Sequence, residues 1–150
     1  MGKKPFSLET VLSYRESLVE LREAELATAL QLQRHAEETL QALRSEWTRA
    51  LASARALKAA ERLDQAGLLA AESYLARLEA DLAQQVQAVQ ELVQRTEACR
   101  TALSEALKDK KKIERLKERE QLLWAQEEAR AEQALADDLN TIRYPWRKVI

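Results

Sequence analysis

Residues that interrupt helices are almost absent from this sequence. Among its 150 residues, glycine occurs only at Gly2 and Gly67, and proline only at Pro5 and Pro145. The long stretches between them are rich in alanine, leucine, glutamate, glutamine, lysine and arginine, which are the strongest helix formers. With one phenylalanine and so few turn residues, a compact globular core is not expected. The sequence therefore predicts a protein made of long helices.

Apolar residues follow a heptad pattern in two segments. In the first, they alternate in steps of three and four: Leu40, Leu43, Trp47, Ala50, Ala54 and Leu57. The same phase extends back to Leu8, and a second series runs from Leu75 to Ala106. Near Lys110 we expect the phase to slip, so that Ile113, Leu116 and Leu123 rejoin the seam. Two seams of similar length indicate two helices that pair.

Gly67 lies between the two seams, where a left-handed glycine ends one helix and lets the chain reverse. We therefore predict an all-α fold, a long antiparallel two-helix coiled-coil hairpin forming a single domain over residues 1–150. Ser7 is the expected cap of the first helix, at about 8–64, followed by a turn at about 65–68 centred on Gly67. The second helix is expected at about 69–140, with a flexible tail at 141–150. This register places Leu43 opposite Leu92.

A continuous helix that pairs with a second chain is the alternative to the hairpin. One glycine costs a helix only about 1 kcal/mol, so Gly67 alone does not force a reversal. A short connection between two seams nevertheless favours antiparallel neighbours, and we expect a monomer.

Charge is zoned along the second helix although the net charge is only -1. Residues 108–120, "KDKKKIERLKERE", carry seven bases, most of which have an acidic residue three or four positions away. A DNA-reading helix would carry fewer acids on its contact face and polar readers such as asparagine or glutamine among its bases. We therefore expect no nucleic-acid partner. The acidic stretch "QEEARAEQALADD" follows, and such zoning can orient a protein partner.

Groups that could carry out chemistry are scarce. His35 is the only histidine and Cys99 the only cysteine, and no glycine-rich phosphate loop is present. We expect no enzymatic activity, no cofactor and no metal site. No run of about 20 apolar residues and no signal-peptide pattern occur, which predicts a cytoplasmic protein. The tail "RYPWRKVI" mixes bases with aromatic residues, as in segments that touch a membrane surface or a partner, but a frayed terminus is the expectation.

Four segments in order resemble the FliJ family of flagellar export proteins. The leader "FSLETVLSYRESLVELREAELA", starting at Phe6, is followed by "SYLARLE", "KKKIERLKERE" and "AEQALADDLNTIR". The resemblance covers nearly the whole chain, from Phe6 to about Arg143. Asp138 departs from the family, which often has glutamate there, and the turn has unusually little glycine, asparagine or serine.

The resemblance implies a non-enzymatic, cytoplasmic component of the flagellar type III export apparatus, peripheral to the inner membrane through its partners. Its hairpin would be similar to the central stalk of rotary ATPases. The implied partners are the hexameric export ATPase FliI, which it would stimulate, the export gate protein FlhA, and export chaperones.

Two sets of candidate partner-binding residues follow from this resemblance. Those matching the gate-facing surface by position are Leu43, Trp47, Tyr74 and Leu78. Those of the basic stretch that would approach the ATPase are Lys111, Lys112, Arg115 and Arg119. The alternatives are the corresponding stalk protein of an injectisome secretion system, a membrane-associated scaffold coiled coil, and a substrate-specific chaperone.

Overall fold

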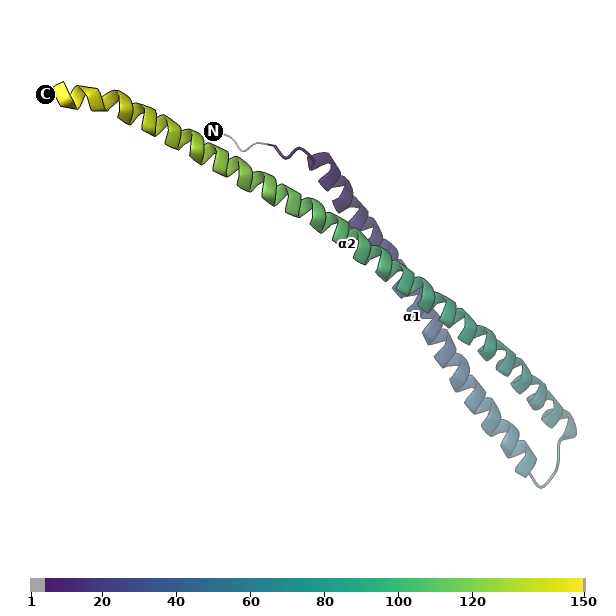
Figure 1. Cartoon of the computed structure of the whole chain (residues 1–150). Helices are drawn as coiled ribbons and strands as arrows, with labels where there is room; N and C mark the ends of the chain where they lie inside the picture. Colours follow the sequence, from purple (N-terminus) through teal and green to yellow (C-terminus); the bar gives the residue numbers. More distant parts are fainter. Residues whose placement is uncertain (1–4, 150) are drawn as a thin grey trace. The chain divides into compact units, whose positions relative to one another are not determined.

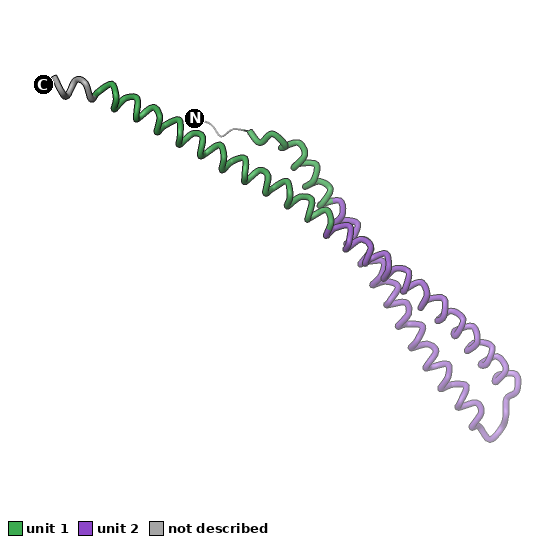
Figure 2. The backbone as a smooth tube through the Cα atoms, viewed as in Figure 1, with its two compact units in different colours: residues 1–20, 105–150 green, residues 21–104 purple. Residues whose placement is uncertain are grey.

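Two long helices that pack against each other make up the fold. The computed structural model describes the backbone of residues 5–149 and the side chains of residues 5–143. Helix α1 spans Glu9–Ala59 and helix α2 spans Gln65–Val149, and the chain reverses between them (Figure 1). The predicted all-α hairpin is confirmed. The chain divides into two compact units that each contain part of both helices, residues 1–20 with 105–150 and residues 21–104 (Figure 2).

The reversal occurs at residues 60–64, earlier than the predicted turn at 65–68. Asp64 caps α2, because its backbone carbonyl accepts a hydrogen bond from the Leu68 amide at 2.9 Å and its side chain accepts one from the Gly67 amide at 3.0 Å. Gly67 thus lies in the first turn of α2. No glycine among the described residues has a positive φ, so the predicted left-handed conformation of Gly67 was wrong.

Both helices differ from the prediction at their ends. The Ser7 hydroxyl, expected to cap α1, instead donates a hydrogen bond to the Glu120 carboxylate of α2 at 3.0 Å. Helix α2 begins at Gln65 rather than near residue 69, and residues 141–143, expected in the flexible tail, continue the helix. The side chains of residues 144–150, which include most of "RYPWRKVI", lie outside those that the structure describes.

The unit of residues 21–104 has a narrow core of mostly small residues. Its buried positions are Ala29, Ala36, Leu40 and Ala54 of α1 with Leu78 and Thr96 of α2. The Gln85 side-chain amide donates to the Ala36 carbonyl at 2.9 Å, and Tyr74 donates to Glu46. Between these two contacts Leu43 lies at the level of Leu78, not of Leu92 as predicted. The register differs because the chain reverses before Gly67.

In the unit of residues 1–20 and 105–150, a short apolar core is extended by polar pairs. Phe6, Leu12 and Val19 are buried with Ala106. Further along α2, the less exposed positions continue the heptad without a break: Lys110, Ile113, Lys117, Glu120 and Trp124. Leu116 and Leu123 are 42% and 52% exposed, so the predicted phase slip near Lys110 does not occur. Charged residues hold seam positions there, and Lys117 pairs with Glu9 at 3.2 Å.

Candidate partner-binding surfaces

The four residues expected to face the export gate lie together in the unit of residues 21–104. Leu43 and Trp47 are one turn apart on α1, and Tyr74 and Leu78 are one turn apart on α2. The contact between Tyr74 and Glu46, the residue before Trp47, sets the two pairs at the same level. Helix pairing therefore brings together residues that are 27 or more positions apart in sequence.

Only part of this group is available at the surface. Leu78 is 3% exposed and belongs to the core, whereas Leu43, Trp47 and Tyr74 are half-buried. The Trp47 indole Nε1 is buried and has no hydrogen-bond partner among the described residues. Half-buried aromatic rings on a rigid helix pair are good anchors for a protein partner. Docking at this level would therefore depend on Trp47 and Tyr74 more than on Leu78.

Tyr74 is held by charged neighbours on both helices. Its hydroxyl donates to Glu46 of α1, while the Arg77 guanidinium lies 5.5 Å from the centre of its ring. The hydrogen bond to Glu46, followed by partial desolvation, raises the pKa of the Tyr74 hydroxyl above 10.0. These contacts fix the orientation of the Tyr74 ring.

The four bases expected to approach the ATPase are all exposed on α2 in the unit of residues 1–20 and 105–150. Together with Lys108, which the sequence interpretation had not singled out, they form what we call the basic strip: Lys108, Lys111, Lys112, Arg115 and Arg119. Their spacing of three and four residues puts them on one face. Lys108, Lys112, Arg115 and Arg119 lie opposite the seam positions Ala106, Ile113 and Lys117. The same spacing rule would have identified Lys108.

Few bases of the strip are neutralised within the chain. Lys112 lies 3.8 Å from Asp109, and among the described residues no acidic group pairs with Lys111, Arg115 or Arg119. The nearby Glu114 pairs with Lys110, which is not part of the strip, at 3.6 Å. The sequence predicts an acidic partner three or four residues away for most of these bases, but among the described residues only Lys112 of the strip forms such an ion pair. Most bases of the strip are therefore exposed without an ion pair within the described part of the chain.

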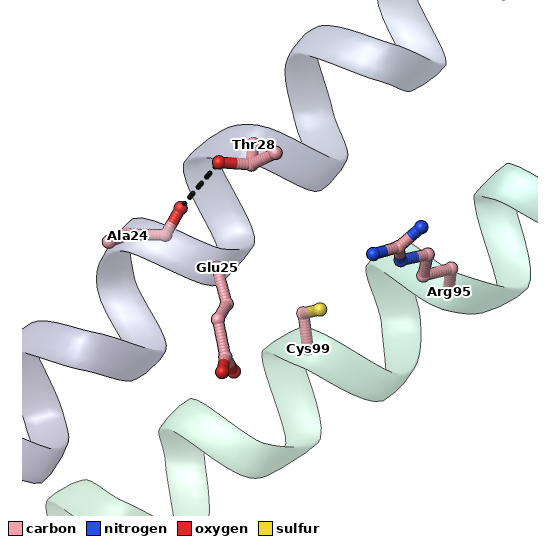
Figure 3. Close-up of a pocket in the computed structure, with 5 residues that line it drawn as sticks. All are labelled: Ala24, Glu25, Thr28, Arg95 and Cys99. Atoms are coloured by element: carbon pink, nitrogen blue, oxygen red, sulfur yellow. Dashed lines mark hydrogen bonds between the residues drawn. The ribbon is translucent and has the colours of Figure 1, made fainter.

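A groove between the helices lies in the unit of residues 21–104. Ala24, Glu25 and Thr28 of α1 line it with Arg95 and Cys99 of α2, enclosing about 370 Å³ (Figure 3). The Thr28 hydroxyl donates to the Ala24 carbonyl at 3.1 Å, and Glu25 pairs with Arg22 at 3.0 Å. The Cys99 thiol is partly exposed, with Arg95 one turn before it on α2 and no histidine or second thiol among the groove residues. The groove residues therefore include no histidine that could act as the base for a cysteine nucleophile.

Within the described part of the chain, no three histidine, cysteine, aspartate or glutamate side chains come together in a way that could hold a metal ion. None of the described helical segments combines the length and the apolar character needed to cross a membrane.

Comparison with known proteins identifies one family. Neither the curated proteins nor the solved structures include a match to this chain. The family described as Flagellar FliJ protein matches residues 3–148, a range that contains α1, all of α2 except its last residue, and both candidate surfaces. The family consists of non-enzymatic coiled-coil components of the flagellar type III export apparatus. The chain therefore belongs to the flagellar FliJ protein family, as a component of the flagellar export apparatus.

Proposed function

We propose that this protein is a monomeric, stalk-like subunit that binds the hexameric export ATPase FliI and stimulates its activity. The observation that carries this proposal is the basic strip. Its bases are exposed, mostly unpaired within the described residues, and lie on α2 away from the seam. An acidic partner surface can therefore contact them without separating the two helices.

The expected affinity of this contact suits a hairpin that turns within the ATPase or dissociates from it. Each exposed ion pair is worth about 0.2–1 kcal/mol, so the five bases of the strip together give a moderate and salt-sensitive affinity. Positive charge along one face also speeds the encounter with an acidic surface. Stimulation would then come from the position of the hairpin in the ATPase, since the family is non-enzymatic.

The proposal includes the export gate protein FlhA and the export chaperones as further partners, at the cytoplasmic side of the export apparatus. The surface that supports a gate contact is formed by Trp47, Tyr74 and Leu43 in the other unit. It is apolar and aromatic, whereas the basic strip is charged, so the two partners would be recognised by different chemistry.

A charge reversal of the strip tests the ATPase contact. The variant Lys112→Glu, Arg115→Glu, Arg119→Glu should keep wild-type helicity and melting, because seam residues such as Ile113 are untouched. We expect weaker binding to FliI, a smaller salt dependence and reduced stimulation of ATP hydrolysis. The matched control reverses three exposed arginines of α1 whose guanidinium groups form no ion pair among the described residues, Arg34, Arg44 and Arg55. Unchanged FliI affinity and stimulation at low salt in the first variant would refute the proposal.

A further inference from the structure

The last part of α2 carries an apolar stripe that no described residue covers. Ser7 contacts α2 at Glu120, and α2 continues well beyond that level in the same unit (Figure 2). Past Trp124, apolar residues recur at spacings of four, four and three; we call them the distal stripe: Ala131, Leu135, Leu139 and Ile142. Leu135 and Ile142 are both 62% exposed and Leu139 is 47% exposed. Three large apolar side chains on one face of an exposed helix indicate a binding surface.

The distal stripe continues the seam that pairs α2 with α1. Lys117 and Trp124 are seam positions seven residues apart, and Ala131 follows seven residues later. Residues separated by seven lie on the same side of a helix, so the stripe faces the direction in which α1 packs nearer the loop. A narrow stripe of this period fits the side chains of another helix. The occupant that suits the distal stripe is therefore helical.

Acidic residues border the distal stripe on both sides. At 3.6 residues per turn, Glu132 lies along one edge, Glu127 and Asp138 lie along the other, and Glu128 is in line with the stripe one turn before Ala131. Two bases adjoin the stripe in sequence: Arg130 is on the opposite face, and Arg143 follows Ile142 near the Glu132 edge, so the four acids outnumber the bases beside the stripe. Charges at the edges of a heptad seam select the partner by complementarity. A second copy of this chain would set acids against acids, which disfavours self-pairing through this surface.

We propose that the distal stripe binds a helix of another protein that presents an apolar heptad seam flanked by lysine and arginine. The partner helix packs on the α2 seam where α1 no longer covers it. Its bases pair with the four acids in and beside the stripe, Glu127, Glu128, Glu132 and Asp138. This surface differs from the basic strip in face and in sign of charge. The inference therefore goes beyond the ATPase contact and does not depend on it.

Two synthetic peptides test this inference on the full-length chain. Both carry the same leucine and isoleucine heptad seam, but one has lysine and the other glutamate at the flanking positions. Fluorescence anisotropy at physiological salt should show that the lysine peptide binds about tenfold or more tightly than the glutamate peptide. The reversal Glu127→Lys, Glu128→Lys, Glu132→Lys, Asp138→Lys should invert this preference. Replacing Leu135 and Leu139 by alanine should weaken binding of the lysine peptide.

A matched control separates local recognition from net charge. Reversal of Glu79, Asp81, Glu91 and Glu105 to lysine makes the same charge change at exposed positions of α2 before the stripe, and it should leave the lysine peptide preferred. The inference is overturned if this control inverts the preference as strongly as the stripe variant. It is also overturned if the leucine substitutions have no effect. Sedimentation that shows a wild-type dimer disrupted by those leucine substitutions would identify a second copy as the occupant and overturn it as well.

Discussion

Asp64 and Gly67 together determine how α2 begins. The Asp64 carboxylate accepts a hydrogen bond from the Gly67 amide in the first turn of α2. A Cβ added at Gly67 would come within 2.9 Å of Asp64 Cγ. Glycine at this position therefore leaves room for the cap. From the sequence alone Gly67 is predicted to end the preceding helix, because an isolated glycine between two seams does not show which helix it serves.

Loss of the Asp64 cap should destabilise the hairpin. We expect Asp64→Ala to lower the free energy of unfolding by about 0.5–2 kcal/mol, since the first-turn amide loses its acceptor. Asp64→Ser keeps a capping oxygen and should lose much less. Urea unfolding followed by circular dichroism compares the three chains. Equal stability of the alanine and serine variants would mean that the cap contributes nothing.

Tyr74 should make stability depend on pH in the alkaline range. Its hydrogen bond to Glu46 raises the pKa of its hydroxyl above 10.0, so the folded chain holds this proton more tightly than the unfolded chain does. The stability from this bond is complete below pH 10.0 and is lost as pH rises through the raised pKa. In Tyr74→Phe this loss is absent. Urea unfolding on both sides of pH 10 should show a steeper fall in stability for wild type, while parallel profiles would contradict the assignment.

At the scale of the helices, the heptad pattern predicted the pairing but not its register. The alternation from Leu40 to Leu57 and from Leu75 to Ala106 was sufficient to predict two paired helices. The pairing of Leu43 with Leu78 depends on where the chain reverses. The residues of the loop indicate the position of that reversal only weakly. The four gate candidates were named by resemblance, and only the pairing of α1 with α2 shows that they are neighbours.

Charged seam residues explain why the phase slip predicted near Lys110 does not occur. At Lys110, Lys117 and Glu120 the heptad holds long polar side chains, so apolar periodicity alone suggested a slip toward Leu116 and Leu123. In the structure these residues are half-buried at seam positions, and Lys117 pairs with Glu9 of α1. Long side chains can hold such positions because their apolar stems pack while their charged ends reach the edge. The exposed face of the basic strip follows directly from this uninterrupted phase.

Truncation of Ile113 and of Leu116 distinguishes the uninterrupted seam from the slipped one. Ile113 is half-buried in the seam, and Ile113→Ala should lower the free energy of unfolding by about 1–3 kcal/mol. Leu116 is 42% exposed, so Leu116→Ala should change it by about 0.5 kcal/mol or less. Urea unfolding of both variants measures the difference. A loss for Leu116→Ala as large as that for Ile113→Ala would support the slipped seam instead.

At the scale of the whole molecule, the division into two units separates the candidate surfaces. The aromatic surface of Trp47 and Tyr74 belongs to one unit, and the basic strip and the distal stripe belong to the other. Within the second unit, positive charge lies on the face opposite the seam, and negative charge borders the seam face further along α2. A single pair of helices can thus offer three chemically different surfaces. Heptad geometry assigns each residue to one face of its helix. The position of the residue along the helix then decides whether that face is already covered by the other helix.

The choice between one hairpin and two paired chains depends on the loop. The heptad phase passes through the loop unbroken, from Leu57 through Glu61, Asp64 and Leu68 to Leu75. Ala60, Glu61, Arg62 and Leu63 are good helix formers, so Asp64 and Gly67 are the residues here that most oppose a continuous helix. A continuous helix would display both seams on one side and could pair with a second chain.

Replacing both residues by alanine should therefore favour a dimer. We expect the wild-type chain to sediment as a monomer, whereas Asp64→Ala with Gly67→Ala should form dimers whose fraction grows with protein concentration. The cause is the loss of the α2 cap together with a gain in helix propensity of up to about 1 kcal/mol at the former glycine. The control Asp81→Ala with Gln84→Ala makes two exposed substitutions at the same spacing within α2 and should remain monomeric. If the loop variant also remains a monomer at every concentration, contacts between the helices rather than the loop residues hold the chain in its hairpin.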